Sequence, residues 1–129
     1  MKRIVIVHGL GAGPEMHWFP WLKEQLASKD CQVLIPHLPG GEHPLLTEWL
    51  AVLEDAVGEP DAKTYFVGHG LGCIAICHYL ARLPSAARVG GCVFVAGFLH
   101  DAELALQSFT QPLPDTHAIR LHTMNFICI

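Results

Sequence analysis

The chain has 129 residues, of which 51% are hydrophobic and 16% are charged, and this composition excludes an intrinsically disordered protein. Its formal net charge is −4, with acidic and basic residues scattered along the sequence. Such a distribution lacks the basic patch that nucleic acid or an anionic membrane surface requires. We therefore expect one globular domain over residues 1–129, with neither nucleic acid nor a membrane as partner.

The start of the chain and its cysteines indicate the cellular compartment of the protein. In "MKRIVIVHGLGAG" the apolar run is only four residues long before His8, whereas the core of a signal peptide needs about seven to fifteen. The run is better explained as a buried strand, and a cytoplasmic protein is predicted. The cysteines are odd in number and lie inside apolar segments, which is typical of reduced thiols that pack as small hydrophobes. They are Cys31, Cys73, Cys77, Cys92 and Cys128.

The first half of the chain alternates between apolar runs and helical stripes. Residues 3–9 and 31–36 are nearly continuous in apolar side chains, which is typical of parallel strands covered on both faces. Two stripes with spacings of three and four residues predict helices that cover the sheet. The first consists of Trp18, Trp21, Leu22 and Leu26, and the second of Leu46, Trp49, Leu50, Leu53 and Val57.

The second half continues the same alternation. Strands are predicted at 63–68, 91–97 and 125–129. A helix follows Gly70, with Ile74, Cys77 and Leu80 on one face, and is expected to end by Pro84. Weaker helical patterns lie around 101–109 and 114–121.

Alternating strands and helices joined by right-handed crossovers give an open parallel sheet. The predicted fold class is therefore α/β, with three α/β/α layers. Ligands of such sheets bind beyond the carboxyl ends of the strands, so we expect any chemistry at that edge.

Two glycine-rich turns follow strands at this edge. The segment "YFVGHGLGCIAICHYL" (65–80) has the layout of a G-x-S-x-G nucleophile elbow, except that Gly70 stands where the serine should be. The first strand runs into "HGLGAG". In an elbow of this kind, amides from the first loop and from the residue after the nucleophile stabilise the oxyanion of acyl transfer. The corresponding amides here are those of Leu10 and Leu71. Singly, each turn is also explained by a glycine in a tight strand-to-helix connection.

The segments "VHGLGAGPEMHWFPWLKEQL", "TYFVGHGLGCIAICHYL" and "GCVFVAGF" resemble the small serine hydrolases of the retinoblastoma-binding-protein-9/YdeN type, a branch of the α/β-hydrolase superfamily. The resemblance implies the strand order 2-1-3-4-5 and a Ser-His-Asp triad that hydrolyses esters or amides without cofactor or metal. It also implies that the acid follows the strand resembling "NFICI" and that the histidine follows one strand later. We therefore expect the chain to lack the triad, the last strand or strands and the last helix.

Histidine and cysteine side chains near the elbow are candidates to replace the missing triad residues. His8, His37, His69 and His100 fall at or after predicted strand ends, but none belongs to a close-spaced ligand pair, so no metal site is predicted. The side chain of His69 should leave the elbow in a different direction from that of residue 70. Cys73 lies one helical turn beyond the elbow, roughly 5 Å along the axis, and cannot serve as the nucleophile.

Three hypotheses of function remain. The first is a member of a serine hydrolase family that is inactive as given, and the second is a binding module that uses the empty elbow for a small ester or amide ligand or for a partner. Residual catalysis by a histidine or metal is the third. Trp18, Trp21 and Phe98 could line a pocket or belong to the core. We also expect self-association through "NFICI" (125–129), an apolar edge strand.

Overall fold

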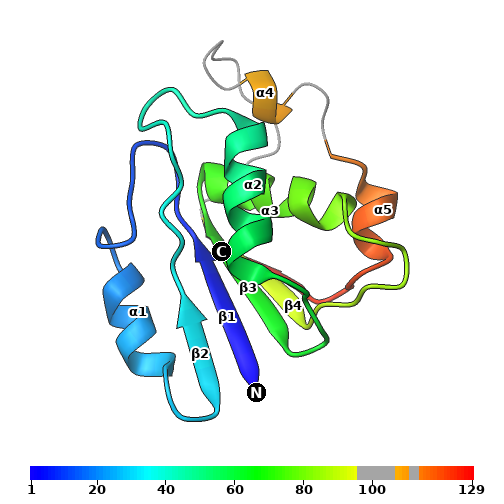
Figure 1. The fold of residues 1–129 in the computed structure, drawn as a ribbon, viewed down its shortest axis with the longest axis horizontal. Helices are drawn as coiled ribbons and strands as arrows, with labels where there is room; N and C mark the ends of the chain where they lie inside the picture. The colour runs from blue at the N-terminus through cyan, green and yellow to red at the C-terminus, as the bar shows by residue number, and fades with distance from the viewer. Residues whose placement is uncertain (96–106, 111–113) are drawn as a thin grey trace.

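The computed structural model describes residues 1–95, 107–110 and 114–129. Five parallel strands form one sheet in the order β2-β1-β3-β4-β5, with helices on both faces (Figure 1). The strands are β1 (Lys2–Val7), β2 (Cys31–Leu34), β3 (Thr64–His69), β4 (Gly91–Val95) and β5 (Phe126–Cys128). The predicted α/β class and the strand order 2-1-3-4-5 are confirmed.

Strand β1 lies inside the sheet because it pairs with β2 on one side and with β3 on the other. Its last four residues are buried, as its continuous apolar run predicts. Arg3 ties this strand to its neighbour, since its guanidinium donates to Thr64 Oγ1 at 3.1 Å and to the Glu59 carbonyl at 2.6 Å.

The helices are α1 (Phe19–Leu26), α2 (Leu46–Val57), α3 (Leu71–Ala81), α4 (Gln107–Thr110) and α5 (Thr116–Arg120). Helices α2 and α3 pack on one face of the sheet, where they form the larger core with Val5, Val7 and Phe66. Four residues of the predicted stripe on α2 are buried, and the fifth, Leu46, is partly buried. Helix α3 is buried on nearly every side, and its end at Ala81 comes shortly before the predicted stop at Pro84.

Helix α1 covers the opposite face but presents a different stripe from the predicted one. Phe19 is fully buried against Ile4 and Ile6, while Trp21 is 61% exposed. The helix begins at Phe19, so Phe19 and Leu22 share the face toward the sheet and Trp21 lies on the other side. The prediction that Trp21 covers the sheet was wrong.

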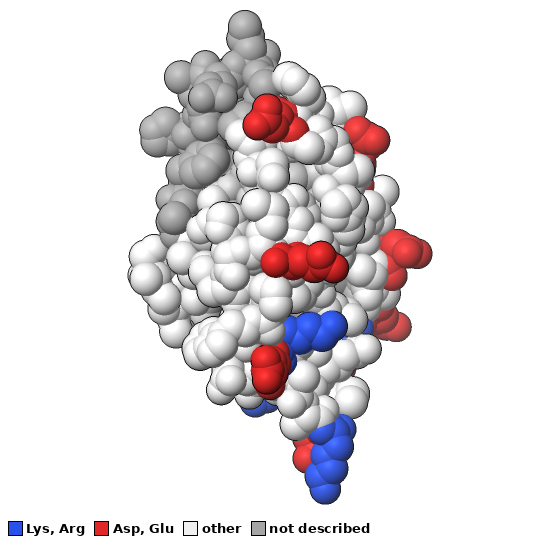
Figure 2. All heavy atoms as spheres, turned by 90° about the vertical axis from the view of Figure 1, so that its left-hand side faces the viewer, with Lys and Arg blue, Asp and Glu red and all other residues white. Residues whose placement is uncertain are grey.

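Near the C-terminus, α5 falls within the predicted 114–121 segment. Its N-cap is Asp115, whose carboxylate accepts from the His117 amide at 3.0 Å. Of the other predicted helix, residues 101–106 lie outside the described residues, and so do residues 96–97 of the predicted fourth strand. Within the described part of the chain, no helix is both long and apolar enough to cross a membrane. Charged side chains on the face toward α1 and β2 are scattered, with uncharged surface between them (Figure 2).

Candidate functional site

The turn between β3 and α3 has the backbone of an elbow. Gly70 adopts φ 57° and ψ −122°, a conformation that side chains with a Cβ rarely adopt. Its amide donates to the Val95 carbonyl at 3.0 Å, and its carbonyl accepts from the Cys73 amide at 3.1 Å. Among the described residues, no heavy atom outside the turn lies within 4 Å of a Cβ built on Gly70. The turn therefore points position 70 away from the described part of the chain, although the residue there has no side chain.

The two flanking glycines are explained by packing. A Cβ on Gly72 would lie 2.2 Å from the Val7 carbonyl oxygen, and one on Gly68 would lie 3.0 Å from the Cys73 amide nitrogen. Strand β1, strand β3 and helix α3 thus meet backbone to backbone at the elbow. This close approach requires the two flanking glycines, Gly68 and Gly72, independently of which residue stands at position 70.

The loop after β1 lies directly against the elbow. A Cβ on Gly9 would come within 2.9 Å of the His69 carbonyl oxygen and 3.6 Å of the Leu71 amide nitrogen. Leu71 opens α3, where the first amides of a helix have no intrahelical acceptor. Within the described residues, no backbone carbonyl accepts from the amide of Leu71 or from that of Leu10. The two predicted oxyanion donors therefore belong to neighbouring segments, and the helix dipole favours negative charge at this point.

His8 is a structural residue of the same loops. Its ring is buried, Nε2 accepts from the Leu38 amide at 2.9 Å, and Nδ1 lies 3.0 Å from the Gly9 carbonyl oxygen. An Nε2 that accepts carries no proton, so the ring is neutral and donates from Nδ1. Burial lowers the pKa of His8 below its usual value, and nearby His37 lowers it further. Both ring nitrogens are occupied, so this histidine is not available as a base.

His69 lies in an aromatic cluster with residues that precede and begin α1. Its ring centroid lies 5.2 Å from that of His17, 5.7 Å from that of Trp18 and 5.8 Å from that of Phe19. Burial lowers the pKa of His69, and the neighbouring His17 lowers it further. Trp18 and Trp21 were both candidates to line a pocket. Trp18 contacts His69, whereas Trp21 is exposed on α1.

The sequence reasoning missed His17. It has φ 55°, and it is the non-glycine residue with positive φ among the described residues. Histidine tolerates this region better than most residues, and backbone strain of this kind clusters at functional sites. The signal available was its position directly before Trp18, within the "HWFPWL" segment on which the family resemblance rests.

The thiols near the elbow are not nucleophiles. Burial raises the pKa of Cys73 to about 11 and that of Cys77 to about 12, so both are protonated near neutral pH. The Cys73 thiol donates to the Val95 carbonyl at 3.7 Å. All five cysteines are free.

Two other residues considered for the site, Phe98 and His100, lie outside the described residues. His37 lies beside His8, with ring centroids 6.0 Å apart, and does not join the cluster around His69. In the part of the chain that the structure describes, no group of three His, Cys, Asp or Glu side chains is placed to hold a metal ion.

Comparisons with known proteins indicate the family to which the chain belongs. A family model described as serine hydrolase matches residues 4–125. YdeN of Bacillus subtilis (strain 168) is 37% identical over 112 residues, which are 85% of this chain and 59% of YdeN. The crystal structure of the ydeN gene product matches with a TM-score of 0.87 at 34% identity, covering 99% of this chain and 70% of that chain. The chain thus spans 59% of the length of this curated relative.

Two further crystal structures share the fold alone. A variant of tomato methylketone synthase I, complexed with beta-ketoheptanoate, matches at 20% identity, and DBJA matches at 18%, each with a TM-score of 0.52. Both matches cover 85% of this chain, but only 45% and 40% of the respective structures. At this level of identity they support the α/β architecture and carry no function over.

Proposed function

Since the chain belongs to the serine hydrolase family, we propose that its elbow is a hydrolase site without a nucleophile, which binds small esters or amides and does not cleave them. The observation that carries this proposal is Gly70. It takes the place of the nucleophile in a turn with the elbow's geometry, yet it has no atom that could attack a carbonyl carbon. No acyl-enzyme can form at this position.

The binding part of the proposal depends on the two amides beside Gly70. The amides of Leu10 and Leu71 lie on segments that contact each other and are free of backbone acceptors within the described residues. Two such donors, placed at a helix N-terminus, suit a carbonyl or carboxylate oxygen. Without a side chain at position 70, a ligand could approach them closely.

A hydroxyl alone would not restore efficient catalysis. A serine at its ordinary pKa is a poor nucleophile without an adjacent base. The described imidazoles nearest to the elbow are not suited to this role, because His8 uses both ring nitrogens and His69 stacks on the α1 side. We therefore expect oxyanion stabilisation alone, which in other hydrolases leaves about 10³–10⁴-fold over the reaction in water.

The test compares the natural chain with Gly70→Ser and Gly70→Ala, using p-nitrophenyl acetate hydrolysis and labelling by a fluorophosphonate probe. We expect no labelling and no enzymatic turnover for the natural chain, and neither efficient labelling nor efficient turnover for Gly70→Ser. Gly70→Ala is the control for backbone strain, because it adds a Cβ without a hydroxyl. Strong labelling of Gly70→Ser that is abolished by a second change, His69→Ala, would show that a base is present and would overturn the proposal.

The second candidate is a module that binds a protein partner and no small ligand. The two candidates are separated by titrating ¹⁵N-labelled protein with p-nitrophenyl acetate. Ligand binding at the elbow predicts chemical-shift changes at the amides of Leu10 and Leu71, and little change at the exposed Leu45, which lies at the start of α2. If neither elbow amide shifts at saturating ester, the ligand site is refuted and the interaction module is favoured.

A further inference from the structure

His8 holds the peptide group that carries the Leu10 amide. Its Nδ1 donates to the Gly9 carbonyl oxygen at 3.0 Å. This carbonyl and the Leu10 N–H belong to one planar trans peptide group, in which the C=O and the N–H point in opposite directions. A bond that fixes the oxygen on one side of the peptide group therefore fixes the direction of the N–H on the other side.

A second bond holds the same peptide group from within the loop. The Ala12 amide donates to the Gly9 carbonyl oxygen at 3.3 Å, so this oxygen accepts two hydrogen bonds. Hydrogen bonds to a carbonyl polarise its peptide group and strengthen the N–H of that group as a donor. The Leu10 N–H has no backbone acceptor within the described residues, so it is both oriented and available for a ligand.

The His8 ring is itself held in place by the segments that surround it. Its Nε2 accepts from the Leu38 amide at 2.9 Å, and the Trp49 ring of α2 packs edge-on with the ring centroids 5.7 Å apart. Trp49 is buried, and its Nε1 donates to the Pro39 carbonyl at 2.7 Å. Turning the imidazole would therefore break both of its hydrogen bonds and disturb this packing. A neutral imidazole suits the position because it carries one donor and one acceptor on a small rigid ring.

Only the neutral form of His8 can make both bonds. Protonation places a hydrogen on Nε2, which would then face the N–H of Leu38, so that two donors would oppose each other. The groups that face the ring do not stabilise a cation. His37, from the loop after β2, is another imidazole with its centroid 6.0 Å away, and Trp49 of α2 is uncharged. Among the described residues, no Asp or Glu forms an ion pair with His8. An imidazolium must therefore leave this position, and the Gly9 carbonyl loses the bond that orients its peptide group.

We propose that His8 is a positioning residue of the elbow site, which in its neutral form aims the Leu10 N–H at the carbonyl oxygen of a bound ester or amide and on protonation releases it. This inference rests on the proposed function, since it concerns how the affinity of the same site is regulated. His8 is buried and acts through the Gly9–Leu10 peptide group. Because burial lowers the pKa of His8, ligand affinity should be full at neutral pH and decline as the pH falls through that lowered value.

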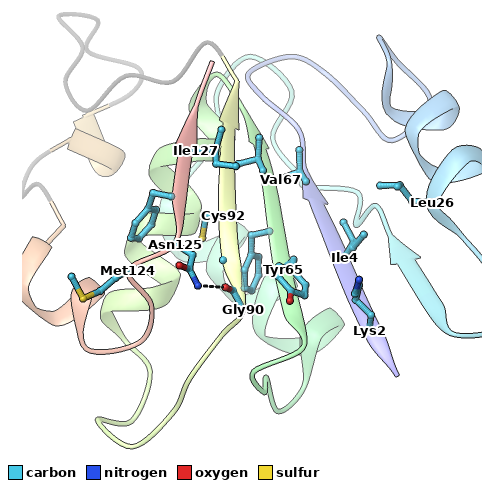
Figure 3. A pocket seen from close by; sticks show the side chains of 14 residues that line it. Lys2, Ile4, Leu26, Tyr65, Val67, Gly90, Cys92, Met124, Asn125 and Ile127 are labelled. Carbon is cyan, nitrogen blue, oxygen red and sulfur yellow. Dashed lines mark hydrogen bonds between the residues drawn. The ribbon is translucent and has the colours of Figure 1, made fainter.

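The first test needs no ligand and is an NMR titration of the ¹⁵N-labelled natural chain between pH 7.5 and 5. The Leu10 amide should shift with the same midpoint as the ring resonances of His8. The Tyr65 amide is the reference and should show no transition at this midpoint, because Tyr65 lines a hollow on the α1 face of the sheet, away from α2 (Figure 3). A Leu10 amide that does not follow His8 would overturn the proposal. If Leu10 follows His8 although p-nitrophenyl acetate does not bind, the proposed function is refuted and the orientation by His8 stands.

Two variants separate positioning from a purely structural role. His8→Asn and His8→Leu both remove the imidazole acceptor of the Leu38 amide, but only asparagine keeps an N–H near the position of Nδ1. At pH 7.5, His8→Leu should raise the dissociation constant for p-nitrophenyl acetate by about tenfold, and His8→Asn should restore most of this loss. Equal dissociation constants for the two variants would show that His8 is only structural and would overturn the proposal.

The pH dependence of binding gives a second readout from the same proteins. In the natural chain the dissociation constant should rise about tenfold between pH 7.5 and 5, and in His8→Asn this dependence should largely disappear. An unchanged pH dependence in His8→Asn would assign the effect to another group, such as His69, and would also overturn the proposal. Circular dichroism establishes that the proteins stay folded over this range, and the titration of the natural chain decides the proposal even where a variant does not fold.

Discussion

The centre of the sheet and strand β5 differ in how closely they are packed. Around the elbow, β1, β3 and α3 approach so closely that a single methyl group on Gly72 would meet the Val7 carbonyl at 2.2 Å. At β5, a strand of three residues, the Ile127 side chain is mostly exposed. The close packing is present although residue 70 has no side chain. The elbow is therefore part of what holds the fold together, independently of its role in function.

The largest effect should come from Gly72→Ala. The added methyl group clashes with two backbone carbonyls, those of Val7 and His8, which cannot move without shifting β1. We expect a loss of at least about 3 kcal/mol in the free energy of unfolding. Urea denaturation measures it.

Gly13→Ala is the matched control for this prediction. Among the described residues, a Cβ on Gly13 meets only the His37 ring, at 4.0 Å, so the change should stay within about 0.5 kcal/mol. Equal losses for the two variants would show that the elbow is no more tightly packed than a surface loop.

An intermediate effect is expected for His8→Gln, and it should depend on pH. The folded-state pKa of His8 lies below its unfolded value of about 6.5, so the unfolded chain takes up the proton first as the pH falls. Stability is therefore full above this pH and declines below it. At neutral pH the variant should lose about 1–3 kcal/mol, because the Leu38 amide loses its imidazole acceptor.

Thermal unfolding between pH 7.5 and 5 measures the slope. In His8→Gln the slope should be shallower than in the natural chain, though not flat, because the pKa of His69 is lowered as well. The exposed His43 serves as control, since His43→Gln should leave the stability at neutral pH unchanged. An unaltered slope in His8→Gln would mean that this ring does not stay neutral in the fold.

The smallest effect is expected at β5. Ile127→Val removes a methylene group from a side chain that is 61% exposed and should change the free energy of unfolding by less than about 0.5 kcal/mol. The same change at the fully buried Ile74 of α3 should cost about 0.5–1.5 kcal/mol. Both are measured by urea denaturation at concentrations where the chain is monomeric. A cost at Ile127 that equals the cost at Ile74 would contradict the contrast between the two regions.

The sequence was sufficient for the order of the elements and for the location of the elbow. Buried parallel strands need continuous apolar runs, and the glycines at 68, 70 and 72 are each required by a backbone contact or by a positive φ. Which face of α1 packs against the sheet could not be predicted in the same way. In a helix of eight residues, Phe19 and Trp21 are both apolar, and only the tertiary packing decides which of them is buried.

The backbone of the candidate site could be predicted better than its side chains. Gly70 and Leu71 lie at the predicted strand-to-helix turn, and the loop that holds Leu10 lies against it, whereas the roles of the Leu10 and Leu71 amides stay predictions. The strained backbone of His17 and its contact with His69 depend on how the loop before α1 folds back over β3, which no local pattern encodes. The hydrogen bond from the Leu38 amide to His8 could not be predicted for the same reason, because Leu38 is thirty residues away in the sequence.

The inner position of β1 has a consequence for how the protein is made. This strand is synthesised before the other strands of the sheet, yet its β3 neighbour begins with Thr64, sixty-one residues after Arg3. During synthesis β1 can pair only with β2 until α2 and β3 have emerged, so its apolar edge is exposed for several seconds at ordinary elongation rates. Closing a loop of this length also slows the formation of the sheet. Nascent chains that stall before β3 should therefore depend on chaperones, whereas chains released after β3 can already bury β1 on both sides.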